Sequence, residues 1–112
     1  MALKMKAGDA VIEMLRQEGV SHMFGIVGSS FLDILDPLYD RDDLRFIGVR
    51  HEQGAAFMAD VYGRLTGRAG VCLSTLGPGA TNLVTGVADA NMDRSPVVAI
   101  AGQAATTRMH KE

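Results

Sequence analysis

The sequence has no tryptophan, a single cysteine and no basic stripe. A lone Cys72 cannot form an internal disulfide or a multi-cysteine metal cluster, and it fits a reducing cytoplasm. The 11 basic and 13 acidic residues are spread along the chain and leave a formal net charge of -2. This balance predicts no nucleic-acid or anionic-membrane surface, so small molecules and other protein chains are the expected partners.

Long apolar runs are also missing. No segment reaches the ~18 uninterrupted apolar residues of a membrane span, and residues 1–6 lack the apolar core and cleavage site of a signal peptide. We therefore expect a cytoplasmic chain with no membrane partner. Aromatic residues make up 5% of the sequence and hydrophobic residues 47%, so aliphatic residues and Met must build the core. Together with 13 glycines, this composition is typical of tightly packed α/β layers.

The length of 112 residues allows one domain with a modest core. An active site built between two domains cannot be complete in such a chain. No further strand pattern follows Gln103. We therefore expect residues 1–112 to be part of a longer protein.

Hydrophobic spacing divides the chain into alternating strands and helices. Strands are predicted over residues 22–27, 45–49, 70–75 and 96–101. Helices are predicted over residues 6–18, 52–66 and 78–93, with Gly19 and Gly67 as stops after the first two. Ser29 or Ser30 is expected to cap a further helix to about Tyr39, which Pro37 shortens or kinks.

The apolar positions also predict which sides of these segments face inward. In the first helix, the residues with helical spacing are Ala7, Ala10, Val11, Met14 and Leu15. In the helix after residue 78, the inward residues are expected to be Leu83, Val84, Val87 and Ala88. Residues 96–101 are almost wholly apolar, which predicts a strand covered on both faces.

The regular alternation of strand and helix predicts an α/β fold with three layers. We expect a mainly parallel sheet with helices on both faces and a flavodoxin-like, truncated topology. Ligands of such sheets gather beyond the carboxyl ends of the strands. Four segments lie at those predicted ends, namely the turn at residues 25–30, the pair His51-Glu52, the turn at residues 77–82 and the pair Gly102-Gln103.

The turn at residues 77–82 follows a strand and opens a helix, so its backbone amides could receive an anion. It is not a dinucleotide fingerprint, because Asn82 stands where the third glycine is required. The alternative is a tight turn in which Pro78 pre-sets the first helical turn. The glycine-rich turn at residues 25–30 has the same ambiguity, since its glycines can equally serve a positive φ angle or a close contact between helix and sheet.

Glu52 stands where a strand gives way to a helix. A glutamate in a first helical turn is ordinarily a surface residue that stabilises the helix dipole. The small residues that follow, Gly54, Ala55, Ala56 and Ala59, indicate close packing instead. A carboxylate lodged in such a packed interface can share a proton with a nitrogen of a ligand.

Other reactive side chains carry weaker patterns. No metal-ligand spacing joins the three histidines, so we assign no protein-bound metal to His22, His51 and His110. Ser29 and Ser30 lack the context of a hydrolase nucleophile, and Cys72, inside a strand, is interpreted as a small buried apolar residue.

Residues 50–60, 63–67 and 77–82 together resemble the N-terminal, pyrimidine-binding (PYR) domain of thiamine-diphosphate enzymes. The spacing between Glu52 and the Gly-Pro-Gly turn, and the later residues 99–103, are most similar to acetolactate synthases within that family. The resemblance covers nearly the whole chain. It identifies residues 1–112 as a partial PYR domain of a longer enzyme, expected to be inactive alone.

The resemblance also implies roles for single residues. Glu52 would hydrogen-bond the cofactor's aminopyrimidine ring and promote loss of the thiazolium C2 proton, after which a 2-keto acid such as pyruvate is decarboxylated and joined to a second one. Pro78, Gly79 and Asn82 would pack near the pyrimidine. Gly28 and Gln103 would face the reacting carbons.

In the family, a separate C-terminal domain holds the diphosphate through Mg2+, and each active site lies between two subunits. The resemblance therefore implies a homodimer or tetramer in branched-chain amino acid biosynthesis, with FAD left open for the full-length protein. Residues 25–29 depart from many acetolactate synthases and are also similar to sulfoacetaldehyde acetyltransferases, so the acceptor stays open. The alternatives are that enzyme, another 2-keto acid decarboxylase, or a non-catalytic flavodoxin-like module in which Glu52 only starts a helix.

Overall fold

The computed structural model describes residues 4–110 of the chain. Its four strands are β1 (His22–Gly25), β2 (Arg45–Gly48), β3 (Gly70–Ser74) and β4 (Val97–Ala101). They form one sheet in the order β2-β1-β3-β4, and every pairing is parallel. The predicted α/β fold with a parallel sheet is therefore confirmed.

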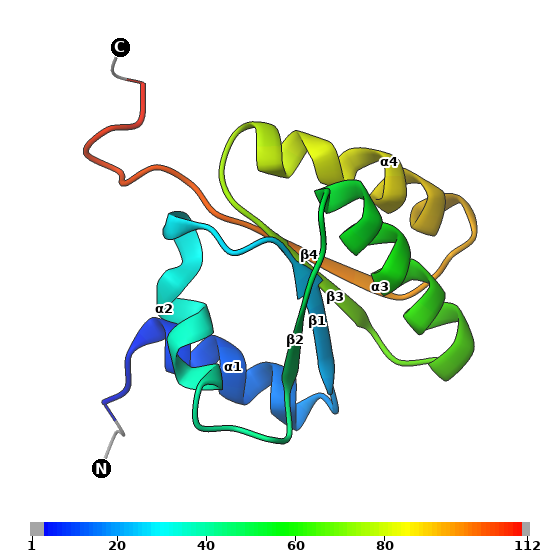
Figure 1. Cartoon of the computed structure of the whole chain (residues 1–112), viewed down its shortest axis with the longest axis horizontal. Coiled ribbons are helices and arrows are strands. Elements are labelled where there is room, and N and C mark those ends of the chain that lie inside the picture. The colour runs from blue at the N-terminus through cyan, green and yellow to red at the C-terminus, as the bar shows by residue number, and fades with distance from the viewer. Residues whose placement is uncertain (1–3, 111–112) are drawn as a thin grey trace.

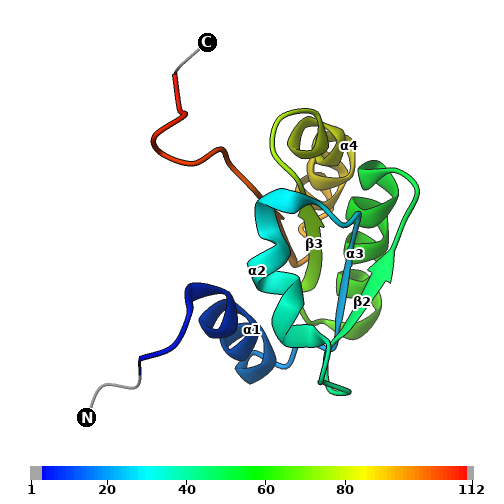
Figure 2. The same cartoon turned by 60° about the vertical axis from the view of Figure 1, so that its left-hand side comes forward.

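Helices cover both faces of this sheet. They are α1 (Ala7–Gln17), α2 (Leu32–Leu35), α3 (Glu52–Thr66) and α4 (Pro78–Met92). Figures 1 and 2 show α1 and α2 on one face and α3 and α4 on the other. Because side chains alternate along a strand, β1 sends Met23 to the α1 side and Phe24 to the α3 side, and β3 divides Leu73 and Cys72 in the same way.

The segment around α2 is broken into three short turns, as Pro37 predicted. A 3-10 turn at Ser29–Phe31 precedes α2, and a second at Asp36–Leu38 contains the proline. The expected serine cap is wrong, since no side chain caps either segment. Ser30 instead pairs its hydroxyl with that of Thr75 at 2.9 Å.

The predicted inward faces of two helices are partly wrong. In α1 the buried residues are Gly8 and Ile12, whereas Met14 is 67% exposed. In α4 the buried residues are Gly79, Leu83, Gly86 and Ala90, whereas Val84 is 60% exposed and Ala88 is also exposed. Glycines, which hydropathy does not score as core residues, line the closest helix contacts. A methyl group on Gly86 would lie 2.5 Å from Cβ of Ala56 on α3.

The expectation that residues 96–101 are covered on both faces is also wrong. In the described part of the chain, Val98 on one face of β4 is 42% exposed, and Ala99 and Ala101 on the other face are exposed too. β4 is also an edge strand of the described sheet and pairs only with β3. A shallow apolar groove runs between α4 and β4, lined by Val84, Val87, Ala88, Ala99 and Ala101 among others.

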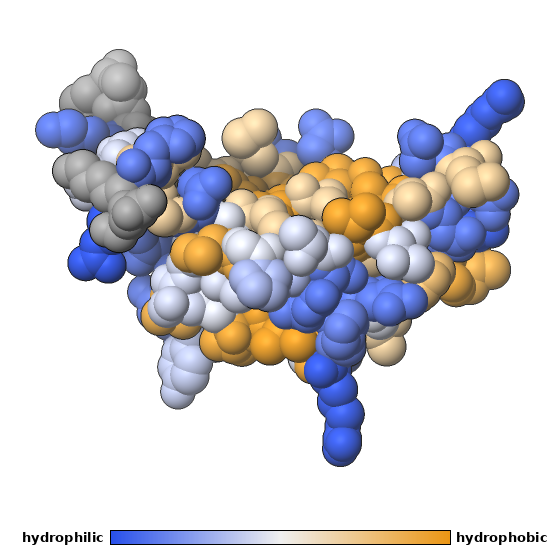
Figure 3. Space-filling view, turned by 90° about the horizontal axis from the view of Figure 1, so that it is seen from above, coloured by the Kyte–Doolittle hydropathy of each residue, from blue (hydrophilic) through white to orange (hydrophobic). Residues whose placement is uncertain are grey.

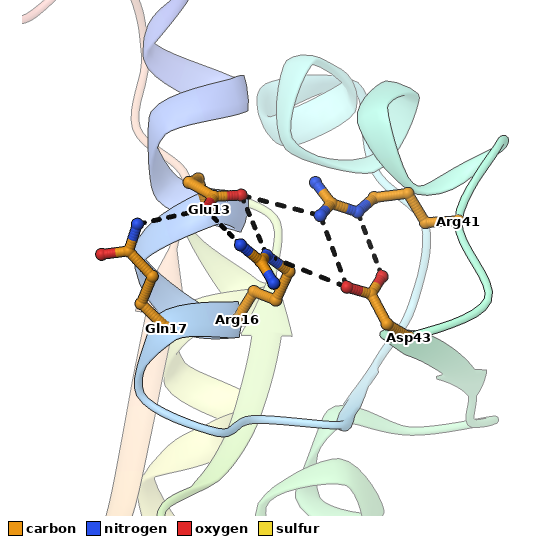
Figure 4. Close-up of polar contacts among 5 residues, drawn as sticks. All are labelled: Glu13, Arg16, Gln17, Arg41 and Asp43. Carbon is orange, nitrogen blue, oxygen red and sulfur yellow. Dashed lines mark hydrogen bonds and ion pairs between the residues drawn. The ribbon is translucent and has the colours of Figure 1, made fainter.

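A charged cluster ties α1 to the loop before β2 (Figure 4). Glu13 accepts hydrogen bonds from Arg16 at 2.6 Å and from Gln17 at 3.1 Å, and it lies 3.6 Å from Arg41. Arg41 also pairs with Asp43 at 3.1 Å.

Within residues 4–110, no helix is long and apolar enough to cross a membrane.

Candidate functional site

The carboxyl ends of the parallel strands meet at one edge of the sheet, and α3 and α4 begin at that same edge (Figure 1). Both helices are 15 residues long and pack against each other along the second face. The starts of the two helices therefore lie close together, although their residues are about 30 positions apart in the sequence. The candidate residues were predicted from the sequence to lie at this edge.

Glu52 is the first residue of α3, and only 9% of it is exposed. The preceding His51 caps the helix, because its Nδ1 accepts a hydrogen bond from the backbone N–H of Gln53 at 3.1 Å. The side chain of Asn82, on α4, donates from Nδ2 to Oε2 of Glu52 at 3.0 Å. No hydrogen bond described for residues 4–110 engages the other oxygen, Oε1.

The first turn of α4 approaches Glu52 closely at Gly79. A Cβ atom placed on Gly79 would lie 3.3 Å from Oε1 of Glu52 and 2.9 Å from Cγ2 of Thr75. The second distance is shorter than real Cβ contacts allow. Glycine therefore lets the backbone of α4 reach the carboxylate, and any side chain would fill the space beside Oε1.

The turns after β1, β3 and β4 are locked together beside this carboxylate. Ser30 and Thr75 share a hydrogen bond, and a Cβ atom on Gly28 would lie 2.8 Å from Cβ of Thr75. A Cβ atom on Gly102 would collide with Oγ of Ser30 at 2.0 Å. These close contacts fix the positions of the strand ends relative to one another.

The structure thus brings together Glu52, Gly79 and Asn82, and it places Gly28 beside the neighbouring Thr75. Pro78 starts α4 on the exposed side of the turn. Gln103 is exposed, and its Oε1 accepts a hydrogen bond from the backbone N–H of Ala104 at 2.8 Å. No contact described for residues 4–110 joins Gln103 to Glu52.

Ser74 and Thr75 also lie at this site, although no sequence motif predicted a role for them. Ser74 ends β3, is fully buried, and its Oγ has no hydrogen-bond partner among residues 4–110. The available signal was two hydroxyl residues closing an otherwise apolar strand at the ligand edge of the sheet.

Cys72 is confirmed as a small buried residue. It is fully buried, and burial raises the pKa of its thiol from 9.0 to about 11. The side chain therefore stays a neutral thiol at physiological pH and packs with Phe24, Ala55 and Leu83 between the sheet and the second helix layer.

Residues 5–112 match the family described as thiamine pyrophosphate enzyme, N-terminal TPP binding domain. The chain is 55% identical over 104 residues to an acetolactate synthase of Mycobacterium bovis, which covers 92% of this chain. It is 54% identical over 102 residues to a probable acetolactate synthase large subunit of Methanocaldococcus jannaschii, covering 91% of the chain. An acetolactate synthase large subunit of Corynebacterium glutamicum is 49% identical over 100 residues, covering 89%.

The matched regions are short relative to these proteins. They amount to 17% of the length of the Mycobacterium bovis and Methanocaldococcus jannaschii proteins and 16% of the Corynebacterium glutamicum protein.

Proposed function

Because the chain belongs to the N-terminal TPP-binding domain family of thiamine pyrophosphate enzymes, we propose that it binds the aminopyrimidine end of thiamine diphosphate at Glu52. It would do so within a longer acetolactate synthase that joins two molecules of pyruvate, with loss of carbon dioxide, into 2-acetolactate. The names of its relatives support this choice of reaction. Residues 1–112 would be part of its PYR domain.

One observation carries this proposal. The carboxylate of Glu52 is buried, and its two oxygens have unlike surroundings, since Oε2 accepts from Asn82 while Oε1 borders the space above Gly79. A glutamate that only stabilised a helix dipole would extend into solvent. A buried oxygen with spare acceptor capacity fits a planar ring that carries a polar nitrogen.

The residues of this chain would divide the work of binding. Asn82 donates to Oε2 and so fixes the plane of the carboxylate. Oε1 would share a proton with the nitrogen of the ring. Gly79 lets the ring approach the backbone of α4, with Pro78 beside it. Burial of Glu52 keeps water from competing for the same oxygen, which strengthens a hydrogen bond made there. When bound, the cofactor supplies a carbon nucleophile and an electron sink for decarboxylation.

The remaining parts of the proposed active site rest on the family resemblance. Gly28 and Gln103 would face a 2-keto acid, with Gly28 held beside Thr75 and Gln103 after the end of β4. The diphosphate would be held through Mg2+ by a C-terminal domain of a second subunit in a homodimer or tetramer. We also propose a cytoplasmic location, a place in branched-chain amino acid biosynthesis, and FAD as an optional component of the longer enzyme.

The test is Glu52→Gln in the longer enzyme. We expect the exchange of the C2 proton of bound thiamine diphosphate to slow by at least about a hundredfold, because an amide cannot share a proton with the ring. Circular dichroism should report an unchanged fold. Glu18→Gln makes the same chemical change at an exposed residue after α1 and should exchange at the wild-type rate. Wild-type exchange in Glu52→Gln would contradict the proposal.

A further inference from the structure

Ser74 stands out among the polar residues of the sheet. It is the last residue of β3 and is fully buried, and within residues 4–110 its Oγ is the one buried side-chain polar atom that lacks a hydrogen-bond partner. Buried hydroxyls are nearly always paired, because an unpaired one loses its bonds to water without replacing them. An unpaired hydroxyl at the ligand edge of a sheet therefore calls for a partner.

The geometry of β3 places Ser74 on the same face of the sheet as Glu52. Cys72, two residues earlier in the strand, packs on the face covered by α3 and α4, so Ser74 lies on that face too. A Cβ atom on Gly79 would lie 3.5 Å from Cβ of Ser74 and 3.3 Å from Oε1 of Glu52. Ser74 and the free carboxylate oxygen thus border the same small space above Gly79.

The neighbouring hydroxyl cannot take this part. Thr75 already shares its hydroxyl with Ser30 at 2.9 Å, and the side chain of Asn82 donates to the opposite oxygen, Oε2, at 3.0 Å. Among the side chains that border this space, Ser74 is therefore the hydroxyl donor without a partner. Rotation of its side chain between staggered positions moves the hydroxyl without moving the strand.

We infer that Ser74 is a positioning residue, whose hydroxyl donates a hydrogen bond to Oε1 of Glu52 when the aminopyrimidine ring occupies the site. This inference rests on the proposed function. A carboxylate oxygen has two lone pairs, so Oε1 accepts from Ser74 on one side and meets the ring nitrogen on the other. With Asn82 on Oε2, both oxygens are held and the carboxylate cannot turn away from the ring.

The test uses the longer enzyme with Ser74→Ala, loaded with thiamine diphosphate and magnesium. At saturating cofactor we expect the exchange rate of the C2 proton to fall about tenfold, as for loss of one hydrogen bond to a charged group. The Kd for the cofactor should change less than about threefold, because most binding contacts remain. The thermal midpoint of the cofactor-free enzyme should not fall, since the hydroxyl has no partner there. A purely structural role would lower that midpoint.

Two further variants make the result specific to the hydroxyl. Ser74→Thr keeps the hydroxyl and should recover at least about half of the wild-type exchange rate, because the donor is restored. Cys72→Ala removes a small buried side chain from the same face of the same strand and should exchange at the wild-type rate. The inference is overturned if Ser74→Ala exchanges normally, if Ser74→Thr shows no recovery, or if Cys72→Ala is slowed equally.

Glu52→Gln, measured in parallel, separates this inference from the proposed function. If Glu52→Gln also exchanges at the wild-type rate, the proposed function itself fails. If Glu52→Gln is slow while Ser74→Ala is normal, the assignment of Glu52 stands and only the role of Ser74 is lost.

Discussion

At the scale of single residues, the candidate site depends on how closely two helix starts approach each other. Glu52 begins α3 and Asn82 lies in the second turn of α4, yet their side chains are 3.0 Å apart. Gly79 makes this approach possible because it presents no side chain toward Oε1 of Glu52. The space beside that oxygen therefore exists because residue 79 is a glycine and has no Cβ atom.

Gly79→Ala tests this space directly. The added Cβ would lie 2.9 Å from Thr75 and 3.3 Å from Oε1 of Glu52, so we expect it to occupy the space of the ring. Cofactor affinity of the longer enzyme should fall about tenfold or more, measured by titration calorimetry. Gly54→Ala is the matched control, because a Cβ there meets nothing within 4 Å, and it should leave the affinity unchanged. Equal affinities in both variants would show that the ring does not bind at Gly79.

The burial of Glu52 could be predicted from sequence, whereas its contacts could not. The small residues Ala55, Ala56 and Ala59 indicated a tightly packed helix start, and the carboxylate is indeed buried. The hydrogen bond from Asn82 depends on the rotation of α4 relative to α3, which no local pattern encodes. The same holds for Ser74, whose buried and unpaired state follows only from the stacking of both helices on β3.

At the scale of elements, glycine decided which helix faces turn inward. Sequence spacing predicted the helix of α3 with the bounds that the structure has, and it located the other helices within a few residues. It placed Leu15, Leu83 and Val87 correctly but missed the buried glycines of α1 and α4, because it counted apolar side chains. Gly8 packs directly on the backbone of Asp33, and Gly86 packs on Ala56, so these faces are chosen by closeness of approach.

A second tie between α3 and α4 is ionic. Asp60 on α3, with 2% of its side chain exposed, accepts hydrogen bonds from Arg64 at 2.9 Å and 2.6 Å. Arg64 also pairs with Asp89 on α4 at 3.1 Å. It pairs in addition with Asp93, the first residue after the end of α4. The guanidinium beside Asp60 lowers the pKa of that carboxyl and has its own pKa raised in turn.

Asp60→Ala should therefore weaken the contact between the two helices. We expect the free energy of unfolding of the chain in urea to fall by about 1.5–3 kcal/mol, the range for a hydrogen-bonded charged group. Asp93 is another partner of Arg64, and its own side chain is 52% exposed. Asp93→Ala is therefore expected to lower the free energy of unfolding clearly less than Asp60→Ala does. Similar losses in the two variants would mean that burial of Asp60 adds nothing to the tie.

At the scale of the whole molecule, apolar surface remains uncovered. On α3, Met58, Val61 and Leu65 are 45%, 50% and 81% exposed, and the groove between α4 and β4 is lined by alanines and valines. Figure 3 shows apolar residues, in orange, in separate groups on one face, with hydrophilic residues, in blue, between them and around the margin. Exposed patches of this kind mark contacts with further protein. They support the proposal that the chain acts inside a longer enzyme.

The stability of the whole chain should depend on pH at both ends of the scale. Hydrogen bonds from Arg16 and Gln17 lower the pKa of Glu13 from 4.5 to about 2, and Arg64 lowers that of Asp60 from 3.8. The unfolded chain therefore binds protons more readily, so this stability is present above about pH 4.5 and is lost as the pH falls toward 2. Burial raises the pKa of Cys72 from 9.0 to about 11, so its contribution is complete below pH 9 and is lost as the pH rises through 11.

Urea unfolding of the chain between pH 2.5 and 10.5 measures the free energy of unfolding against pH. The fall at low pH is the acid limb of this curve, and the fall at high pH is its alkaline limb. We expect Glu13→Gln to flatten the acid limb, because glutamine has no proton to bind, and to leave the alkaline limb unchanged. Cys72→Ala should flatten the alkaline limb and leave the acid limb unchanged. Since Glu13 lies at the surface, roughly 1 M salt should shrink its share of the acid limb while leaving that of the buried Asp60 largely intact. An acid limb that keeps its slope in Glu13→Gln at low salt would show that the cluster in Figure 4 does not stabilise the folded chain.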